Sequence, residues 1–171
     1  MEDNQLRDRA VTELLRAATG HSSLAALNLS NNAVQDAGAA ELGRFLGACS
    51  PALKELGLAW CNVRKGGAVA VARGLKANTS LQARACARGW CWSHTCRMLA
   101  QTLDISWNAF GSLTGSREAA RALADALSAH VSLTHMDVGH NGLDAGDAKL
   151  LASALVTNHT LQARARVRMA I

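Results

Sequence analysis

The sequence has few aromatic residues and almost no proline. Its 171 residues include two Phe, no Tyr and one Pro, although 49% of the residues are apolar. Leu and Ala dominate this apolar set, and small side chains let helices and strands approach each other closely. The composition therefore favours thin layers that stack closely, either as one compact domain or as a short repeat array.

Paired cysteines, a signal peptide and a long apolar run are also missing. Five cysteines are an odd number in a chain too long to need disulfides for stability. The start, Met1–Asn4, lacks the basic and apolar regions of a signal peptide. No run approaches the roughly 18 apolar residues that span a bilayer. We expect a reducing, cytoplasmic setting and no membrane contact.

Basic charge is concentrated in two segments that contain no acid. Residues 83–101 carry Arg84, Arg88 and Arg97, and residues 163–171 carry Arg164, Arg166 and Arg168. Without these six arginines, 12 basic residues remain against 13 acidic ones, so the net charge of +5 becomes −1. The body of the chain thus lacks the excess of basic residues that binds a phosphate backbone, and nucleic acid is an unlikely partner.

A repeat of 28 or 29 residues organises the chain. The pattern LxxLxLxxN begins at Leu24, at Leu53 and at Leu133, with Cys61 in place of Asn in the second copy. The alternation L-x-L predicts a short strand whose Leu side chains point inward. The ninth residue of the pattern is expected to bond buried backbone groups in the turn that leaves the strand.

Each strand motif is followed by apolar residues at helical spacing. They are Ala39, Leu42, Phe45 and Leu46; Ala119, Ala122, Leu123 and Leu127; and Ala148, Leu151 and Leu155. Asp36, Ser116 and Asp144 are candidate caps of these helices. We therefore predict an α/β fold, a right-handed α/β solenoid (horseshoe) of leucine-rich repeats with parallel strands inside and helices outside. Residues 1–20 are interpreted as an N-terminal helical half-repeat, and residues 21–82 and 102–162 as the repeats.

One copy of the pattern is interrupted. Leu81-Gln82 opens a repeat that continues only at Thr102, so residues 83–101 are interpreted as an irregular insertion. The irregular tail, residues 163–171, departs from the repeat at the same point, after Leu161-Gln162. Two hypotheses stand for these segments: translated intron, or an arginine-bearing loop that binds RNA or acidic surfaces. The cysteines and His94 of the insertion lack paired zinc-ligand spacing, so we expect no metal and no cofactor.

The period, the LxxLxLxxN core and the helix phrase that begins Asp144-Ala-Gly-Asp resemble the ribonuclease-inhibitor-like class of leucine-rich repeats. This class includes ribonuclease inhibitor, Ran GTPase-activating proteins and the repeat regions of nucleotide-binding leucine-rich-repeat receptors. The resemblance implies a non-catalytic scaffold that binds a protein on its concave face or rim, in a chain that is a piece of a longer protein. It also raises an enzyme-like alternative, a Ran-type GTPase-activating protein with Arg64 as the arginine finger.

The third, fifth, seventh and eighth residues of each pattern are expected on the concave face or its rim. Trp60 and Trp107, both at the eighth position, should lie side by side as exposed anchors for a partner; the alternative is that both pack beneath neighbouring loops. Acidic residues in a row nearby would complement a basic partner surface. The predicted partner-binding residues are Asn28, Asn31, Glu55, Trp60, Asp104, Trp107, His135, Asp137 and His140. The partner is a protein of unknown identity, and we expect no small-molecule substrate.

Overall fold

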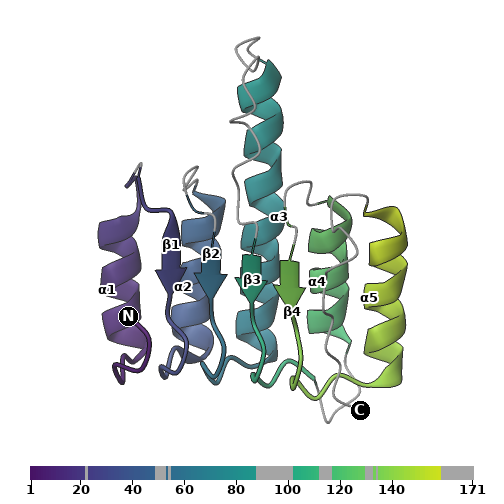
Figure 1. The fold of residues 1–171 in the computed structure, drawn as a ribbon, viewed down its shortest axis with the longest axis horizontal. Helices are drawn as coiled ribbons and strands as arrows, with labels where there is room; N and C mark the ends of the chain where they lie inside the picture. The colour runs from purple at the N-terminus through teal and green to yellow at the C-terminus, as the bar shows by residue number, and fades with distance from the viewer. Residues whose placement is uncertain are drawn as a thin grey trace.

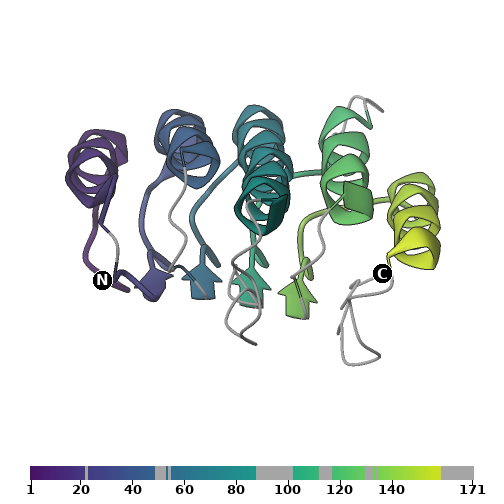
Figure 2. The same ribbon diagram turned by 90° about the horizontal axis from the view of Figure 1, so that it is seen from above.

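Helices and short parallel strands alternate along the chain (Figure 1). The structure is a computed structural model that describes residues 1–21, 23–48, 53, 55–87, 102–111, 117–129, 133 and 135–158, with only the backbone described for residues 79–87. Its elements are α1 (Asp8–Ala18), β1 (Ala26–Asn28), α2 (Gln35–Gly47), β2 (Glu55–Gly57), α3 (Lys65–Ala87), β3 (Thr102–Asp104), α4 (Glu118–Ala129), β4 (His135–Asp137) and α5 (Ala145–Thr157). The strands form one parallel sheet in the order β1-β2-β3-β4. Seen from above, the strands form one layer and the helices another (Figure 2).

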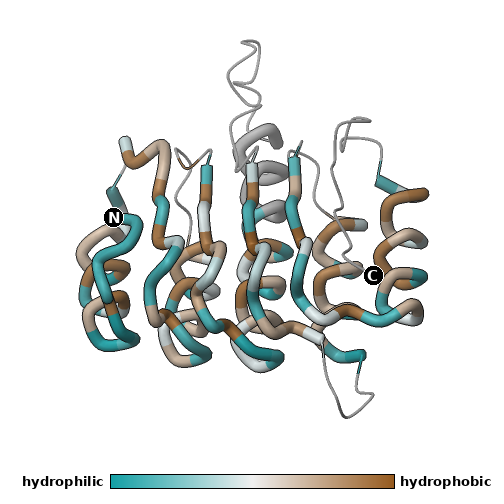
Figure 3. Tube along the Cα trace, turned by 60° about the horizontal axis from the view of Figure 1, so that its bottom comes forward, coloured by the Kyte–Doolittle hydropathy of each residue, from teal (hydrophilic) through white to brown (hydrophobic). Residues whose placement is uncertain are grey.

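The core lies between these two layers. The middle residue of every strand is buried, and these residues pair in register as Leu27, Leu56, Leu103 and Met136. Hydrophilic and hydrophobic stretches alternate along the strands (Figure 3), as expected for strands with one buried face. From the helices, the predicted apolar residues of α2 are all buried, as are most of those of α4. The predicted inward faces of the strands, α2 and α4 are therefore confirmed, whereas in α5 only Leu151 is buried and Ala148 and Leu155 are half-buried.

The ninth residue of the pattern is buried and bonds backbone groups of two repeats. Asn108 donates through Nδ2 to the carbonyl oxygens of Leu58, Ile105 and Ser106, at 2.8, 3.1 and 3.0 Å. Its Oδ1 accepts from the backbone N–H groups of Cys61 and Val63, at 3.2 and 3.0 Å. Each such side chain thus satisfies backbone groups that would otherwise be buried without partners.

Aspartates near the starts of α1 and α2 join each of these helices to the next one. Asp36 does not cap its own helix α2, as the sequence suggested; its Oδ1 accepts from the backbone N–H groups of Arg64 and Gly67, at 2.8 and 3.1 Å, at the start of α3. Asp8 of α1 accepts from Gly38 in the same way. Asp144 does cap its own helix, in a reciprocal capping box with Asp147. Ser116 lies outside the described residues.

Helix α3 extends into the predicted irregular insertion and projects past its neighbours (Figure 1). It continues to Ala87 and includes Leu81 and Gln82, so these two residues do not start a strand, and the first five residues of the expected irregular insertion are helical. Ala, Leu, Gln and Arg have high helix propensity, which explains the continuation. Residues 88–101 and the tail 163–171 lie outside the described residues. No helix in the described ranges combines the length and apolarity needed to cross a membrane.

The first six residues complete the end of a further repeat, not only its helix. Asn4 precedes Asn32 by 28 residues, and Asp3 has the positive φ of 55° found at the equivalent Asn31. The Asp3 N–H donates to the Ser30 carbonyl at 3.1 Å, and Asn32 Oδ1 accepts from the N–H groups of Asn4 and Leu6. This segment therefore covers the loop that leaves β1, with the same bonds that join the loops of later repeats.

Candidate functional site: the strand face and its aromatic rim

The side of the sheet that faces away from the helices presents a grid of side chains. Along each repeat, the third, fifth and seventh pattern residues lie on this side, which we call the strand face; the eighth residue forms its rim. Pairing in register sets equivalent residues of successive repeats side by side. The strand-face rows are Ala26, Glu55, Thr102 and His135; Asn28, Gly57, Asp104 and Asp137; and Ser30, Ala59, Ser106 and Gly139.

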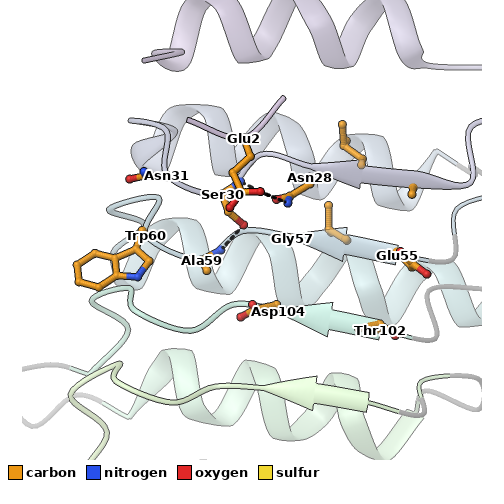
Figure 4. A pocket seen from close by; sticks show the side chains of 13 residues that line it. Glu2, Asn28, Ser30, Asn31, Glu55, Gly57, Ala59, Trp60, Thr102 and Asp104 are labelled. Atoms are coloured by element: carbon orange, nitrogen blue, oxygen red, sulfur yellow. Dashed lines mark hydrogen bonds between the residues drawn. The ribbon is translucent and has the colours of Figure 1, made fainter. Parts of the chain in front are cut away.

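A cavity of about 560 Å³ opens on the strand face over β1, β2 and β3 (Figure 4). Gly57 lies between Asn28 and Asp104, and a Cβ on it would come within 2.5 Å of Asn28 Oδ1. A larger residue at that point would fill the cavity, so this glycine helps to keep it open. Glu55 lies toward one end of the cavity and Trp60 at the other, on the rim (Figure 4). The volume suits a side chain or a short peptide segment.

Three aromatic rings are stacked along the rim. The ring centroids of Trp60 and Trp107 are 4.4 Å apart with an angle of 12° between the planes. Trp107 stacks on its other side against His140, at 3.7 Å and 13°. Trp60 and Trp107 remain 56% and 42% exposed, so they are not packed beneath neighbouring loops. Where two rings of the stack meet, each covers a face of the other, whereas the ring edges stay exposed to solvent.

The rim residues share a left-handed backbone. Asn31, Trp60, Trp107 and His140 have φ values of 57°, 57°, 54° and 56°. Asn and His tolerate this region, whereas for a residue as bulky as Trp it is unusual and costs about 1–2 kcal/mol. The strand-to-strand bonds hold it in place: the N–H of Trp107, for example, donates to the Gly139 carbonyl at 2.9 Å. Unfavourable backbone geometry that the surrounding structure maintains is common at binding sites.

The acidic residues do not form the single row expected from the sequence. Asp104 and Asp137 are neighbours in the fifth-position row, but Glu55 belongs to the third-position row and pairs with Thr102. Asp104 Oδ1 accepts from the N–H and the hydroxyl of Ser106, at 3.0 and 2.7 Å, and Asp137 Oδ1 accepts from the Gly139 N–H at 2.8 Å. These bonds turn the chain from the strand into the rim and leave the second carboxylate oxygens without a recorded partner among the described residues.

All nine predicted partner-binding residues lie on the strand face or the rim; seven of them are exposed, and Asp104 and Asp137 are half-buried. Two are already engaged by the N-terminal segment, because Asn28 donates to Glu2 and Asn31 donates to Asp3, both at 3.0 Å. Sequence reasoning missed Glu2 and Gly57 as parts of the site. Asn4 and Leu6 precede Asn32 and Val34 by 28 residues. This spacing is the sequence signal that could have placed Glu2 beside the strand face.

Tandem strand–helix units with in-register side-chain rows define a parallel α/β repeat protein. Comparison with known proteins agrees with this class. A family model described as Leucine Rich repeat matches residues 20–43. Among solved structures, leiomodin-1 actin-binding site 2 has a TM-score of 0.64 and 17% identity, covering 95% of this chain and 78% of that chain. At this identity the likeness shows the fold alone. A search of curated proteins finds no significant match.

The match of residues 20–43 supports a general relationship to leucine-rich-repeat proteins, and the structural likeness supports an α/β repeat fold.

Proposed function

We propose that this chain is a non-catalytic protein-binding module whose partner docks on the strand face and its rim. The observation that carries the proposal is the exposed stack of Trp60, Trp107 and His140 beside an open cavity. Exposed large apolar side chains that cluster on one surface mark interaction sites, and Trp is enriched among residues that dominate binding energies. The only other large apolar side chains exposed in the described residues are Met1 and Val156.

The proposal includes the finer points of the fold. The repeat period and the Asn or Cys at the ninth position support a short arc of the ribonuclease-inhibitor-like horseshoe, with the strand face as its concave side. The leiomodin-1 segment of similar fold is an actin-binding site, so this architecture serves protein binding there. We propose a cytoplasmic setting, on composition. The comparisons do not favour the alternative of a Ran-type GTPase-activating protein. The RNA-binding alternative rests on the arginine-bearing insertion 83–101, of which residues 88–101 lie outside the described residues.

A capture experiment with two matched surface variants tests this function. The strand-face variant combines Trp60→Ala with Glu55→Lys. The control combines Val156→Ala with Asp125→Lys in the helix layer, where both side chains are exposed. We expect immobilised wild type and control to retain the same proteins from a cell extract, measured by quantitative mass spectrometry, and the strand-face variant to lose them. Equal capture by all three folded proteins would refute docking on the strand face.

A further inference from the structure

We propose that the strand face binds an extended, arginine-bearing segment of a protein partner. One guanidinium stacks on Trp60, and neighbouring basic side chains pair with the carboxylates over the cavity. This inference rests on the proposed function and specifies the chemistry of the partner.

The cavity has an excess of negative charge. Its lining includes the carboxylates of Glu2, Glu55 and Asp104 and contains no Lys or Arg. One oxygen of Glu2 accepts from Asn28, and one of Asp104 accepts from Ser106. Glu55 is exposed, and no ion pair or hydrogen bond of its side chain occurs among the described residues. A cationic side chain entering the cavity therefore meets acceptors with unused capacity.

A second carboxylate pair extends this charge along the sheet. Asp104 and Asp137 face each other in register on β3 and β4, where neighbouring strands are about 4.8 Å apart. Like charges in facing positions on neighbouring strands destabilise a sheet. Within the described ranges, no Lys or Arg forms an ion pair with either residue. A bound cation relieves this repulsion, whereas a phosphate group increases it, so a basic peptide fits this face and a nucleic-acid backbone does not.

The aromatic rim selects arginine over lysine. Trp107 is covered by rings on both sides, but Trp60 is stacked only on the side of Trp107. The next residue along the rim is Asn31, whose Nδ2 donates to the Asp3 carboxylate at 3.0 Å, so the rim row continues past Trp60 to Asn31 and ends at a carboxylate. A planar guanidinium can stack on an indole and donate to such acceptors at the same time. An ammonium group lacks the flat surface needed for stacking.

Three labelled peptides test the proposal against the full chain. Each is a fluorescein-labelled nonapeptide of alternating glycine and a variable residue, which is Arg, Lys or citrulline; alternate residues of an extended segment point to one side. Fluorescence anisotropy measures the dissociation constants. We expect the Arg peptide to bind at least about threefold more tightly than the Lys peptide, in line with an exposed cation–π contact. The neutral citrulline peptide should not bind.

Variants of the chain separate stacking from charge. In Trp60→Ala, the Arg peptide should lose its advantage over the Lys peptide. In Glu55→Gln with Asp104→Asn, both peptides should bind at least about fivefold more weakly and by the same factor; the amide introduced by Asp104→Asn keeps an Oδ1 acceptor for Ser106. Asp125→Asn, an exposed change on α4, is the matched charge control and should leave both affinities unchanged. Urea unfolding of each variant establishes that it is folded.

Three results would overturn the inference. They are the absence of peptide binding, equal affinities for the Arg and Lys peptides in the wild type, and binding of a single-stranded oligonucleotide that Trp60→Ala abolishes, which would assign the indole to stacked bases. If any of these occurs while protein capture still depends on the strand face, the inference fails and the proposed function stands. If capture does not depend on the strand face, the proposed function fails as well.

Discussion

Two rows of side chains that are adjacent in sequence differ in burial and in role: one is exposed to solvent, and the other is buried and bonds the backbone. The eighth pattern residues form the exposed rim, with Trp60 and Trp107 stacked in solvent. The ninth residues, directly after them, are buried and bond the backbones of neighbouring repeats; they include Cys61 and Asn108. The left-handed residue between strand and loop makes this division possible, because it points one side chain outward and the next one inward. We infer that partner chemistry can vary at the rim while the ninth position maintains the stack.

The test of this division with the largest expected effect compares Asn108→Ala with Trp107→Ala. Asn108→Ala removes five hydrogen bonds and leaves buried backbone groups of Leu58, Cys61 and Val63 without that partner. We expect the free energy of unfolding to fall by about 3 kcal/mol or more, since each unsatisfied buried group costs about 1–3 kcal/mol. Trp107→Ala loses two ring contacts, about 0.5–1.5 kcal/mol for each pair beyond the burial of the half-exposed ring, and among the described residues leaves no buried polar group without its partner. Urea denaturation measures the free energy of unfolding of both variants. Equal losses would show that the rim contributes as much to stability as the ninth position.

The second test concerns Cys61, which occupies the ninth position in place of Asn. Its thiol is fully buried and donates to the Leu29 carbonyl at 3.2 Å. The pKa of the Cys61 thiol is raised from 9.0 to about 11, chiefly by burial; the Asn32 backbone N–H partly opposes this rise, and the Asp104 carboxylate adds to it. A folded-state pKa above the ordinary value of 9.0 means that the thiol's contribution to stability is complete below pH 9 and is lost as pH rises through 11.

The variant Cys61→Ser isolates this effect, because a hydroxyl does not ionise in that range and the other four cysteines are the same in both proteins. Between pH 8.5 and 11, the free energy of unfolding of the wild type should fall by roughly 2 kcal/mol more than that of the variant. Urea curves across this pH range give the difference. Parallel pH profiles for the two proteins would contradict a buried, neutral thiol at the ninth position.

The sequence predicts the two rows but not the backbone that separates them. The 28–29-residue period fixes the strand register, and this is why the contact between Trp60 and Trp107 could be expected across the interruption. The left-handed φ of these residues could not, since a letter pattern does not specify φ and Trp gives no propensity signal for it. The Asp36 bond to α3 was missed for a related reason: helix-capping rules consider one helix at a time, whereas here the acceptor comes from the preceding repeat. Helix propensity, applied beyond Gln82, would have predicted the longer α3.

The test with the smallest expected effect examines the left-handed rim directly. It compares the stability of glycine and alanine variants at the rim and at a control site, where the order of stability should reverse. Trp107→Gly and Trp107→Ala lose the same stacking, but glycine adopts a φ of 54° without the steric cost that alanine pays. We expect the glycine variant to be more stable than the alanine variant by about 1 kcal/mol. At Val156, which is 79% exposed in helix α5, the order should reverse, with glycine about 1 kcal/mol less stable than alanine. Urea denaturation of the four variants measures both differences. If alanine is the more stable residue at both sites, the rim backbone is not held in the left-handed region, and the outward direction of the aromatic stack needs another cause.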